Sequence, residues 1–479
     1  MRAAARFILA LAGLGAGLAS GPARAVDPFF PGFGNAGYDV EHYALDLEVD
    51  AARHRLKGYA ELTVRATAPL AGFSLDLRGL AVDVVRIDGV PAAFTLAGGK
   101  LRIRPAAPIA QGHRFVVAVA YRGRPQGIDD PTWGDAPPIP KLGWLDWQDS
   151  SYVVSEPVGA ANWYPVNDEP TDKASYRVSV TVEKPYVAVG NGELIATRDL
   201  GASRRYVWEQ RQPMASYLAM VDIDTFGAER LAGPGGVAIR NYTTPKTPGS
   251  TRAALRMVPA MMDYFAARIG PYPFDAYGAV IVRDPSLYYA LETQGRSTFP
   301  EDRIDEATVA HELAHQWFGD SVTVRQWRDL WLAEGFATYL ELLWGHRDDP
   351  AGFDAAMADL YRYIVDEGVG PAVVSRPEDI FADNTYYRGA LTLYALRQEV
   401  GDTVFFRILR RFHARFAGGN ASSADFIATA VAVSGRPAVR PLLRAWLYDQ
   451  AIPPLAGVAA ADAAAGPVAA PRLGIGVRR

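Results

Sequence analysis

One segment of the sequence, VAHELAHQWFGD, holds residue types that can bind a metal ion and activate water. His311 and His315 are four residues apart, so on a helix both imidazoles project from one face, one turn apart. Glu312 lies about 100° around the helix from His311, where it can reach a metal-activated water without ligating the metal. The pattern predicts two nitrogen ligands and a neighbouring general base.

A catalytic zinc site needs a third protein ligand and one open position. Glu334 follows His315 by 19 residues, in the apolar-periodic segment RDLWLAEGFATYLE, and we predict that it is this ligand, on a helix that Asp329 would N-cap. His-Glu-x-x-His alone also occurs by chance, and helical histidines often only complete core hydrogen bonds, but the spaced glutamate favours a metal site. Glu341, seven residues further, either orients a ligating histidine or is a solvated surface residue.

The composition excludes several other classes of protein. Of 479 residues, 49% are hydrophobic and 21% are charged, which excludes disorder over most of the length and predicts roughly two to four domains. The net charge of −4 shows no basic excess, so no nucleic-acid partner is expected. Cysteine is absent, which excludes disulfides, thiolate catalysis and thiolate zinc ligands.

Residues 1–25 have the pattern of a secretory signal peptide. Arg2 and Arg6 precede an apolar run at 7–18, and Ala23-Arg24-Ala25 fits the cleavage rule. A membrane anchor is the weaker alternative, because the run is short for a span. We expect export to a periplasm or the cell exterior, with no stable membrane insertion of the mature chain.

Hydrophobic periodicity predicts a large antiparallel β domain over residues 26–226. Segments such as YALDLEV at 43–49 and RFVVAVAY at 114–121 alternate apolar and polar residues, as half-buried strands do. Asp-Gly, Gly-Gly and Asn-Gly pairs supply turns between such segments. Residues 123–140, rich in Pro, Gly and Asp, are predicted to be a long loop.

The pattern changes at about residue 227. Residues 227–452 contain a helical period near 252–269, a short strand at 277–283, and helical sequence from Asp305 onward. This predicts a mostly helical α/β domain that carries the metal site. The Ala/Gly/Pro-rich tail, 453–479, has no periodicity and is predicted to be disordered.

The two motifs resemble those of the aminopeptidase N family of zinc peptidases, the gluzincins. The resemblance covers about residues 38–450, including SEPVGAANWYPVNDEPTDKASY at 155–176 and YYRGALTLYAL at 386–396, where Arg388 stands in the place of a family lysine. It implies a saddle-like N-terminal β domain, a thermolysin-like catalytic domain and one zinc ion per chain. We expect a short form without the C-terminal helical domain of longer members.

The resemblance also implies a role for each residue of the motifs. His311, His315 and Glu334 would be the zinc ligands, and Glu312 would be the general base. Tyr386 would stabilise the oxyanion through its hydroxyl. Taken by itself, Tyr386 is one of 23 tyrosines and could equally be a buried aromatic.

Two further glutamates would bind the free α-amine of the substrate. Glu292, in YALET at 289–293, matches the glutamate of the family's amine-binding strand, and Glu156 matches a second amine-binding carboxylate. Two converging carboxylates suit one ammonium group. Thr293 stands where the family has asparagine, so a side-chain contact from that position is in doubt.

The leading hypothesis is therefore a zinc aminopeptidase that hydrolyses the first peptide bond of peptides with a free N-terminus. A broader metallopeptidase with a weak requirement for a free amine is the alternative, because the amine-binding strand departs from the family pattern. An inactive peptide-binding relative is disfavoured, since the chain keeps all three ligands and the base. The sequence makes no prediction of the oligomeric state.

Overall fold

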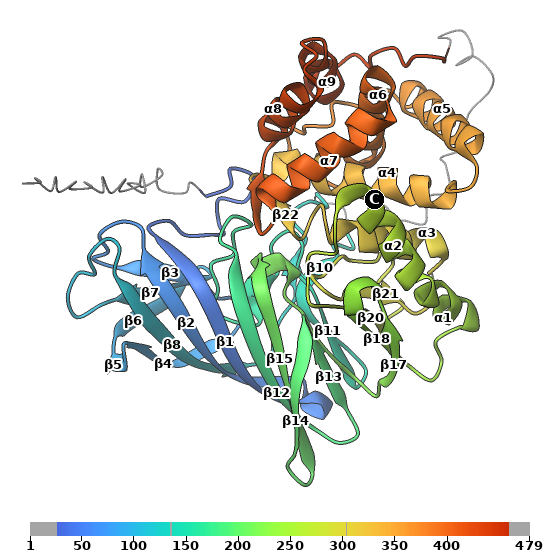
Figure 1. The fold of residues 1–479 in the computed structure, drawn as a ribbon. Coiled ribbons are helices and arrows are strands. Elements are labelled where there is room, and N and C mark those ends of the chain that lie inside the picture. Colours follow the sequence, from blue (N-terminus) through green and yellow to red (C-terminus); the bar gives the residue numbers. More distant parts are fainter. Residues whose placement is uncertain (1–25, 135–136, 303, 459–479) are drawn as a thin grey trace, which may run out of the picture.

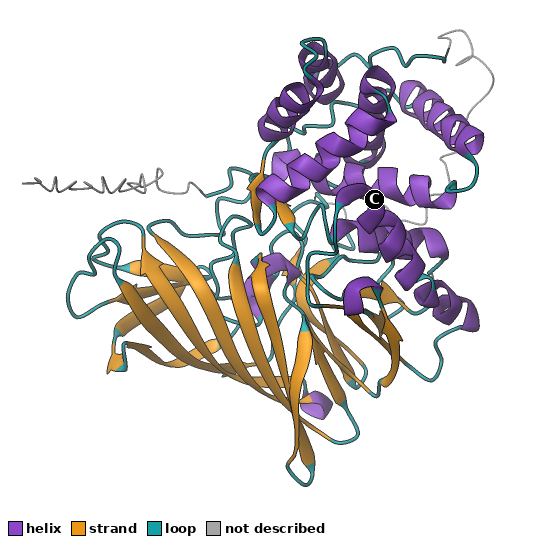
Figure 2. Ribbon diagram, viewed as in Figure 1, coloured by secondary structure: helices purple, strands orange, loops and turns teal. Residues whose placement is uncertain are grey.

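The computed structural model describes residues 26–134, 137–302 and 304–458. Strands dominate the N-terminal half of this part of the chain, and helices gather above them in the C-terminal half (Figures 1 and 2). The signal peptide predicted at 1–25 lies outside the described residues.

The largest layer is an eight-stranded sheet in the order β14-β15-β12-β1-β2-β8-β4-β5. Buried and more exposed residues alternate along β2, as the sequence pattern predicts for a sheet with one face on the core. The pairing is antiparallel except that β1 runs parallel to β12, which departs from the antiparallel domain predicted. The strand bounds are β1 Tyr38–Asp50, β2 Arg55–Ala66, β4 Ala81–Ile87, β5 Val90–Pro91, β8 Arg114–Gly123, β12 Ala174–Glu183, β14 Glu193–Asp199 and β15 Ser203–Met214.

Two smaller sheets complete the β-rich half, in the orders β3-β7-β6 and β13-β16-β11-β10-β9. Every residue of β11 and β16 is buried, so these two strands of the sheet lie inside the molecule. Most of the loop predicted at 123–140 lacks secondary structure, but it includes the two-residue β9. The bounds are β3 Phe73–Asp76, β6 Ala93–Ala97, β7 Lys100–Arg104, β9 Ile128–Asp129, β10 Lys141–Trp147, β11 Ser150–Val154, β13 Val187–Gly190 and β16 Val221–Asp224.

A further sheet, β17-β18-β20-β21, begins at residue 227. Its first pair is antiparallel, and β18, β20 and β21 are mutually parallel. The single strand predicted at 277–283 is interrupted at Gly278, which separates β19 from β20. The bounds are β17 Gly227–Ala232, β18 Ala238–Thr243, β19 Ala276–Tyr277, β20 Ala279–Val282 and β21 Ser297–Pro300.

Helices form the rest of this half. The one helix predicted near 252–269 is two, α1 and α2, because Pro259 in the first turn of α2 cannot continue a preceding helix. The bounds are α1 Gly249–Arg256, α2 Val258–Ile269, α3 Glu306–His315, α4 Trp331–Gly345, α5 Pro350–Asp366, a π-helix at Asn384–Arg388, α6 Gly389–Val400, α7 Asp402–Phe416, α8 Ser423–Ser434 and α9 Val439–Tyr448, with the short parallel pair β22 Val322–Val324 and β23 Gly419–Ala421.

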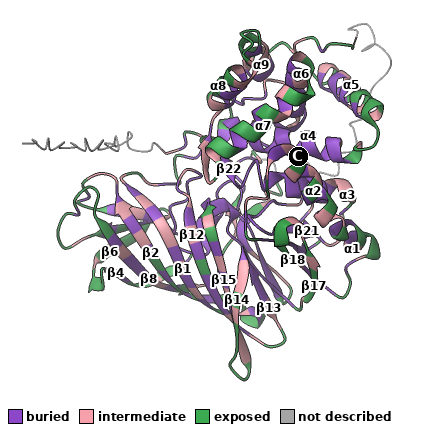
Figure 3. Cartoon of the chain, in the orientation of Figure 1, coloured by how far each residue is buried: buried purple, intermediate pink, exposed green. Residues whose placement is uncertain are grey.

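One large apolar core extends through the sheets and helices, and the buried stretches meet where the helices cover the sheets (Figure 3). Its contents also correct the prediction for the tail. Leu455 is buried in the core, so ordered packing continues past residue 453, to 458. The remainder of the predicted disordered tail lies outside the described residues.

Candidate metal centre

The two histidines lie on α3, whose start is fixed by a side-chain cap. The carboxylate of Asp305 accepts a hydrogen bond from the backbone N–H of Thr308 at 2.8 Å, which satisfies an otherwise unpaired donor of the first turn. His311 and His315 are each 1% exposed. Helix α3 therefore presents both imidazoles, side by side, to the interior of the molecule.

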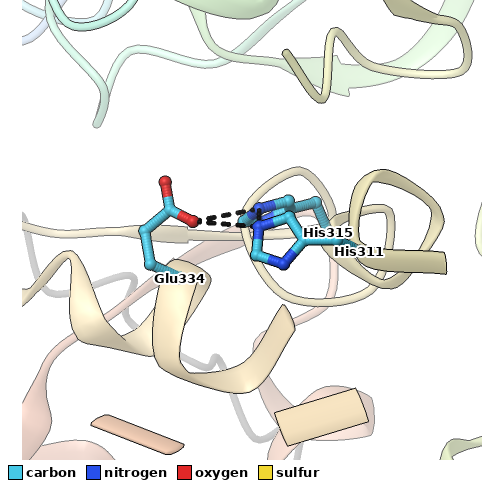
Figure 4. A group of neighbouring side chains, drawn as sticks. All are labelled: His311, His315 and Glu334. Carbon is cyan, nitrogen blue, oxygen red and sulfur yellow. Dashed lines mark hydrogen bonds and ion pairs between the residues drawn. The ribbon is translucent and has the colours of Figure 1, made fainter. Parts of the chain in front are cut away.

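Glu334, in the first turn of α4, points at both histidines (Figure 4). Its Oε2 lies 3.3 Å from Nε2 of His311 and 3.2 Å from Nε2 of His315, and the two Nε2 atoms are 3.0 Å apart. Donors bound tetrahedrally at about 2.0–2.1 Å from zinc lie about 3.3 Å from one another. The three atoms therefore have the spacing that a single zinc ion requires.

The other ring nitrogen of each histidine faces an oxygen. Nδ1 of His311 lies 3.2 Å from Oε2 of Glu341, and Nδ1 of His315 lies 3.2 Å from the backbone oxygen of Phe318. Such oxygens accept a hydrogen bond from Nδ1–H, which leaves the Nε2 lone pair for the metal. Glu341 is 3% exposed, so it lies behind a histidine and is not a solvated surface residue.

The charges of the centre also suit a cation. Burial lowers the pKa of His311, but hydrogen bonds with Glu334 and Glu341 outweigh it and raise that pKa to about 9. Burial raises the pKa of Glu334, but the two imidazoles outweigh it and hold this pKa well below its usual range. Glu312, by contrast, has its pKa raised well above its usual range, first by burial and then by neighbouring carboxylates. This excess of buried carboxylates must be balanced by protons or by a metal ion.

Tyr386 reaches the same centre from the π-helix. Its hydroxyl donates to Oε1 of Glu334 at 3.0 Å, and its ring stacks on that of His311 at 6.3 Å between centroids. A π-helical turn is rare and often occurs at functional sites. The tyrosine that sequence reasoning could single out only by resemblance thus contacts two of the predicted ligands.

The two predicted amine-binding glutamates line the cavity that also contains the predicted metal ligands, Glu312 and Tyr386. Oxygens of Glu292 and Glu312 and a ring nitrogen of His315 lie within 4.8 Å of one another. Glu156 is 1% exposed and forms another wall of this cavity. Thr293 points elsewhere, because its hydroxyl donates to the backbone oxygen of Arg296.

The expected cap of α4 is wrong. Asp329 belongs to a 3₁₀ turn before the helix, and no side chain caps α4. Its Oδ1 instead accepts a hydrogen bond from the hydroxyl of Ser423 at 2.5 Å. Asp329 therefore joins the start of α4 to α8, a tertiary contact that local sequence does not reveal.

Sequence reasoning also missed the glycine pair that lets α4 and α6 touch. A Cβ on Gly335 would lie 2.7 Å from Cα of Gly389, and a Cβ on Gly389 would lie 2.9 Å from Cα of Gly335. Such contacts with backbone cannot be relieved by a change of rotamer. The only sequence signal was an isolated glycine in each of two helical patterns. The pair brings Tyr386 within reach of Glu334.

Lys173 was missed as well. Its half-buried ammonium donates to the backbone oxygens of Asp320 at 2.7 Å and Ser321 at 3.1 Å, in the turn after α3. Burial lowers the pKa of Lys173 to about 7. This residue ties the segment before β12 to the turn that follows the histidines.

The chain matches two family models, the M1 N-terminal domain over residues 39–218 and the peptidase family M1 domain over residues 253–446. Among curated proteins, aminopeptidase A of Gloydius brevicauda is 28% identical over 63% of this chain and 34% of its own length. The probable aminopeptidase 2 of Sulfurisphaera tokodaii is 26% identical over 86% of this chain and 54% of its own length. The chain thus spans about a third to a half of these relatives.

Similar solved structures include the M1 zinc metallopeptidase of Deinococcus radiodurans, determined as a glutamate-to-alanine variant with a Tyr-Ser-Ala substrate. It is 31% identical, and the match covers 90% of this chain and 98% of that chain with a TM-score of 0.83. A two-domain M1 zinc metallopeptidase bound to L-arginine is 32% identical over the same shares of the chains. The donor set, the fold and these matches agree, and this chain belongs to the M1 family of zinc metallopeptidases.

Proposed function

We propose that this protein is a zinc aminopeptidase that removes the first residue from peptides with a free N-terminus. The observation that carries the proposal is a single cavity lined by three metal ligands, a candidate base, a candidate oxyanion donor and two further buried carboxylates. Metal-assisted hydrolysis needs the first three elements. The two extra carboxylates set the substrate class, because a peptide backbone without a terminal amine offers them no cation.

His311, His315 and Glu334 would hold the metal. When bound, zinc polarises the scissile carbonyl and lowers the pKa of a water molecule to about 7. Glu312 takes the proton of that water and passes it to the leaving nitrogen. Its burial at 3% exposure and its place beside His315 suit this role, because the carboxylate can touch the reacting atoms without bulk water competing.

The hydroxyl of Tyr386 donates a hydrogen bond to the scissile carbonyl oxygen, on which negative charge develops. It lies at the cavity wall, next to a metal ligand. A donor fixed at this place stabilises the transition state more than the ground state, because the carbonyl oxygen becomes charged only as the carbon turns tetrahedral.

Glu292 and Glu156 hold the substrate ammonium. The terminal nitrogen and the first carbonyl carbon of a peptide are separated by only two bonds, about 2.5 Å. An ammonium paired with Glu292, whose oxygen lies within 4.8 Å of one from Glu312, therefore places the first peptide bond beside the base. The position of the two carboxylates therefore determines which peptide bond is hydrolysed.

The proposal is tested with pairs of reporter peptides that differ only by N-acetylation. We expect kcat/KM for the free peptide to exceed that for the acetylated one by at least about 30-fold, since a desolvated charge loses its partner. Equal hydrolysis of both would instead assign the broader metallopeptidase. Absence of hydrolysis from a preparation that contains stoichiometric zinc would assign the inactive peptide-binding relative.

We also propose that the protein is exported, to a periplasm or to the cell exterior. Support comes from the charged start, apolar run and Ala23-Arg24-Ala25 site of the sequence. None of the described helices is long and apolar enough to cross a bilayer. Cell fractionation with N-terminal sequencing tests the proposal: a mature chain that begins at Val26 supports it, and an intact N-terminus in the cytoplasm overturns it.

A further inference from the structure

We propose that Arg388 is a positioning residue that holds the catalytic hydroxyl of Tyr386 by binding the end of α9. The inference rests on the proposed function, because it assigns Tyr386 to the oxyanion. It goes beyond that function because it links the reacting centre to the backbone near residue 450. The link is made by Arg388, which stands in the place of a family lysine.

Arg388 is fully buried and binds only backbone oxygens. Its side chain donates to six carbonyls at 2.6–3.4 Å, those of Val369, Ala445, Trp446, Asp449, Gln450 and Ala451. The carbonyls of the last helical turn have no partners within their own helix, and the negative end of the helix dipole favours a cation there. Arg388 thus caps α9 from a different element.

Tyr386 and Arg388 belong to the same π-helix. Side chains two residues apart in a helical turn lie on roughly opposite sides of it. One side meets Glu334 through the Tyr386 hydroxyl, and the other meets the end of α9 through the Arg388 guanidinium. The turn is therefore held between the metal centre and α9.

Two other side chains of this turn donate to backbone oxygens. Asn384 donates to the backbone oxygen of Pro371 at 3.0 Å, and Thr385 donates to that of Asp379 at 3.3 Å. Each is one neutral hydrogen bond, whereas the guanidinium makes several charge-assisted ones. The contact of Gly389 with Gly335 fixes how closely the turn approaches α4, and the ring of Tyr387 packs edge-to-face on that of Tyr363. Arg388 adds several charge-assisted hydrogen bonds to the end of α9.

A lysine at this position would keep the charge but supply three donors from one point, where arginine supplies five in a rigid fork. Arg388→Lys and Arg388→Met therefore separate charge from geometry. We expect Arg388→Met to lower kcat by about 10- to 100-fold with KM little changed, as misplacement of a catalytic group does. Arg388→Lys should recover part of the loss, and zinc content should stay at one per chain.

The decisive measurement repeats Arg388→Lys and Arg388→Met in the Tyr386→Phe background. Without the hydroxyl, neither change should lower kcat by more than about twofold, because the two residues act as one unit. Equal losses in both backgrounds, or an unchanged kcat for Arg388→Lys, would overturn the inference. Failure of the proposed function itself is distinguishable, since Tyr386→Phe alone would then leave kcat at its original value.

A control and a second readout separate positioning from general damage. Arg397 lies further along α6 and pairs with Asp402 at 2.8 Å, away from the metal centre, so Arg397→Lys should leave kcat unchanged. In Arg388→Lys, backbone amide hydrogen exchange should be faster than in the original protein in both 384–392 and 439–451. Exchange in the rest of the chain should be unchanged. Acceleration confined to 439–451 would show that α9 is not coupled to the tyrosine, and would overturn the inference without reference to activity.

Discussion

The hydroxyl of Tyr386 donates a hydrogen bond to Oε1 of Glu334 across 3.0 Å, while Oε2 of the same carboxylate faces Nε2 of His311 and of His315. One side chain thus serves both the metal and the proposed oxyanion donor. This hydrogen bond holds the hydroxyl at the cavity before any substrate arrives, and because a phenol has a single O–H proton, that proton must be turned from Glu334 to the oxyanion during the reaction.

Tyr386→Phe removes this donor while keeping the ring that packs on His311. We expect kcat and kcat/KM to fall together by about 10²–10³-fold with KM nearly constant, since the lost interaction forms only in the transition state. Steady-state kinetics on an unblocked reporter peptide checks this. An effect on KM alone would make Tyr386 a substrate-binding or packing residue.

Glu312→Gln should preserve zinc content but abolish hydrolysis, because Glu312 is assigned as the base and not as a ligand. The expected loss is at least about 10²-fold in kcat. Metal analysis and turnover are measured on the same sample, with His311→Ala as the comparison that should lose the metal. Near-normal turnover in Glu312→Gln would show that the proton leaves by another route.

Glu292→Gln should raise the free energy of the transition state for unblocked peptides by about 2–5 kcal/mol, since the ammonium loses a desolvated charged partner. The residual activity on N-acetylated peptides should change little. Glu367→Gln, at an exposed position, is the matched control. If the free and acetylated substrates lose activity in equal proportion, Glu292 supports the fold of the site and does not bind the amine.

Gly335→Ala should destabilise the protein by about 1–3 kcal/mol, because the new Cβ meets the backbone of Gly389. Gly345→Ala lies on the same helix with nothing within 4 Å of the added Cβ, so it should be neutral or slightly stabilising. Denaturant unfolding of both variants measures the difference. A stable Gly335→Ala protein with normal kcat would show that α4 and α6 separate without cost to the site.

His413 predicts a pH dependence of stability. Burial lowers its pKa to about 4 in the folded protein, against about 6.5 when unfolded. Between about pH 4 and pH 6.5 the unfolded chain binds a proton at His413 that the folded protein does not bind. The stability that neutral, buried His413 contributes is therefore fully present above about pH 6.5 and is lost as the pH falls toward about 4. The loss is about 3 kcal/mol at most.

The measurement compares the free energy of unfolding of the original protein and of His413→Gln from pH 7.5 to pH 4. The difference between them should shrink as the pH falls. His113→Gln, at an exposed histidine, should parallel the original protein at every pH. A difference that stays constant over this range would show that His413 titrates alike in both states.

The grouping of His311, His315 and Glu334 was predictable because their geometry is mostly local. His311 and His315 share one face of one helix, and Glu334 stands at the start of the next. Tyr386 was different, since its place beside Glu334 depends on how α6 packs on α4, which no periodicity encodes. His311, His315 and Glu334 therefore lie on elements that the hydrophobic pattern defines well, whereas Glu156 and Glu292 lie outside helices and strands.

The failures have a common physical cause. Asp329 was expected to cap its own helix but binds Ser423, and Arg388 was matched to a family lysine without any indication that it binds α9. Both partners are remote in sequence, and a polar side chain chooses between local and distant acceptors only when the fold brings the distant one near. The start of α3 was predicted, because the capping residue Asp305 marks it, whereas the break between α1 and α2 at Pro259 was missed.

The parallel pairing of β1 with β12 bears on how the chain assembles. Partners such as His42 and Ser175 are separated by more than a hundred residues, whereas β1–β2 and β14–β15 join neighbours in sequence. Contacts of large sequence separation form late, because the entropy of closing a long loop must be overcome first. We therefore expect the union of the two halves of the large sheet along β1 and β12 to be a late step in the folding of this sheet.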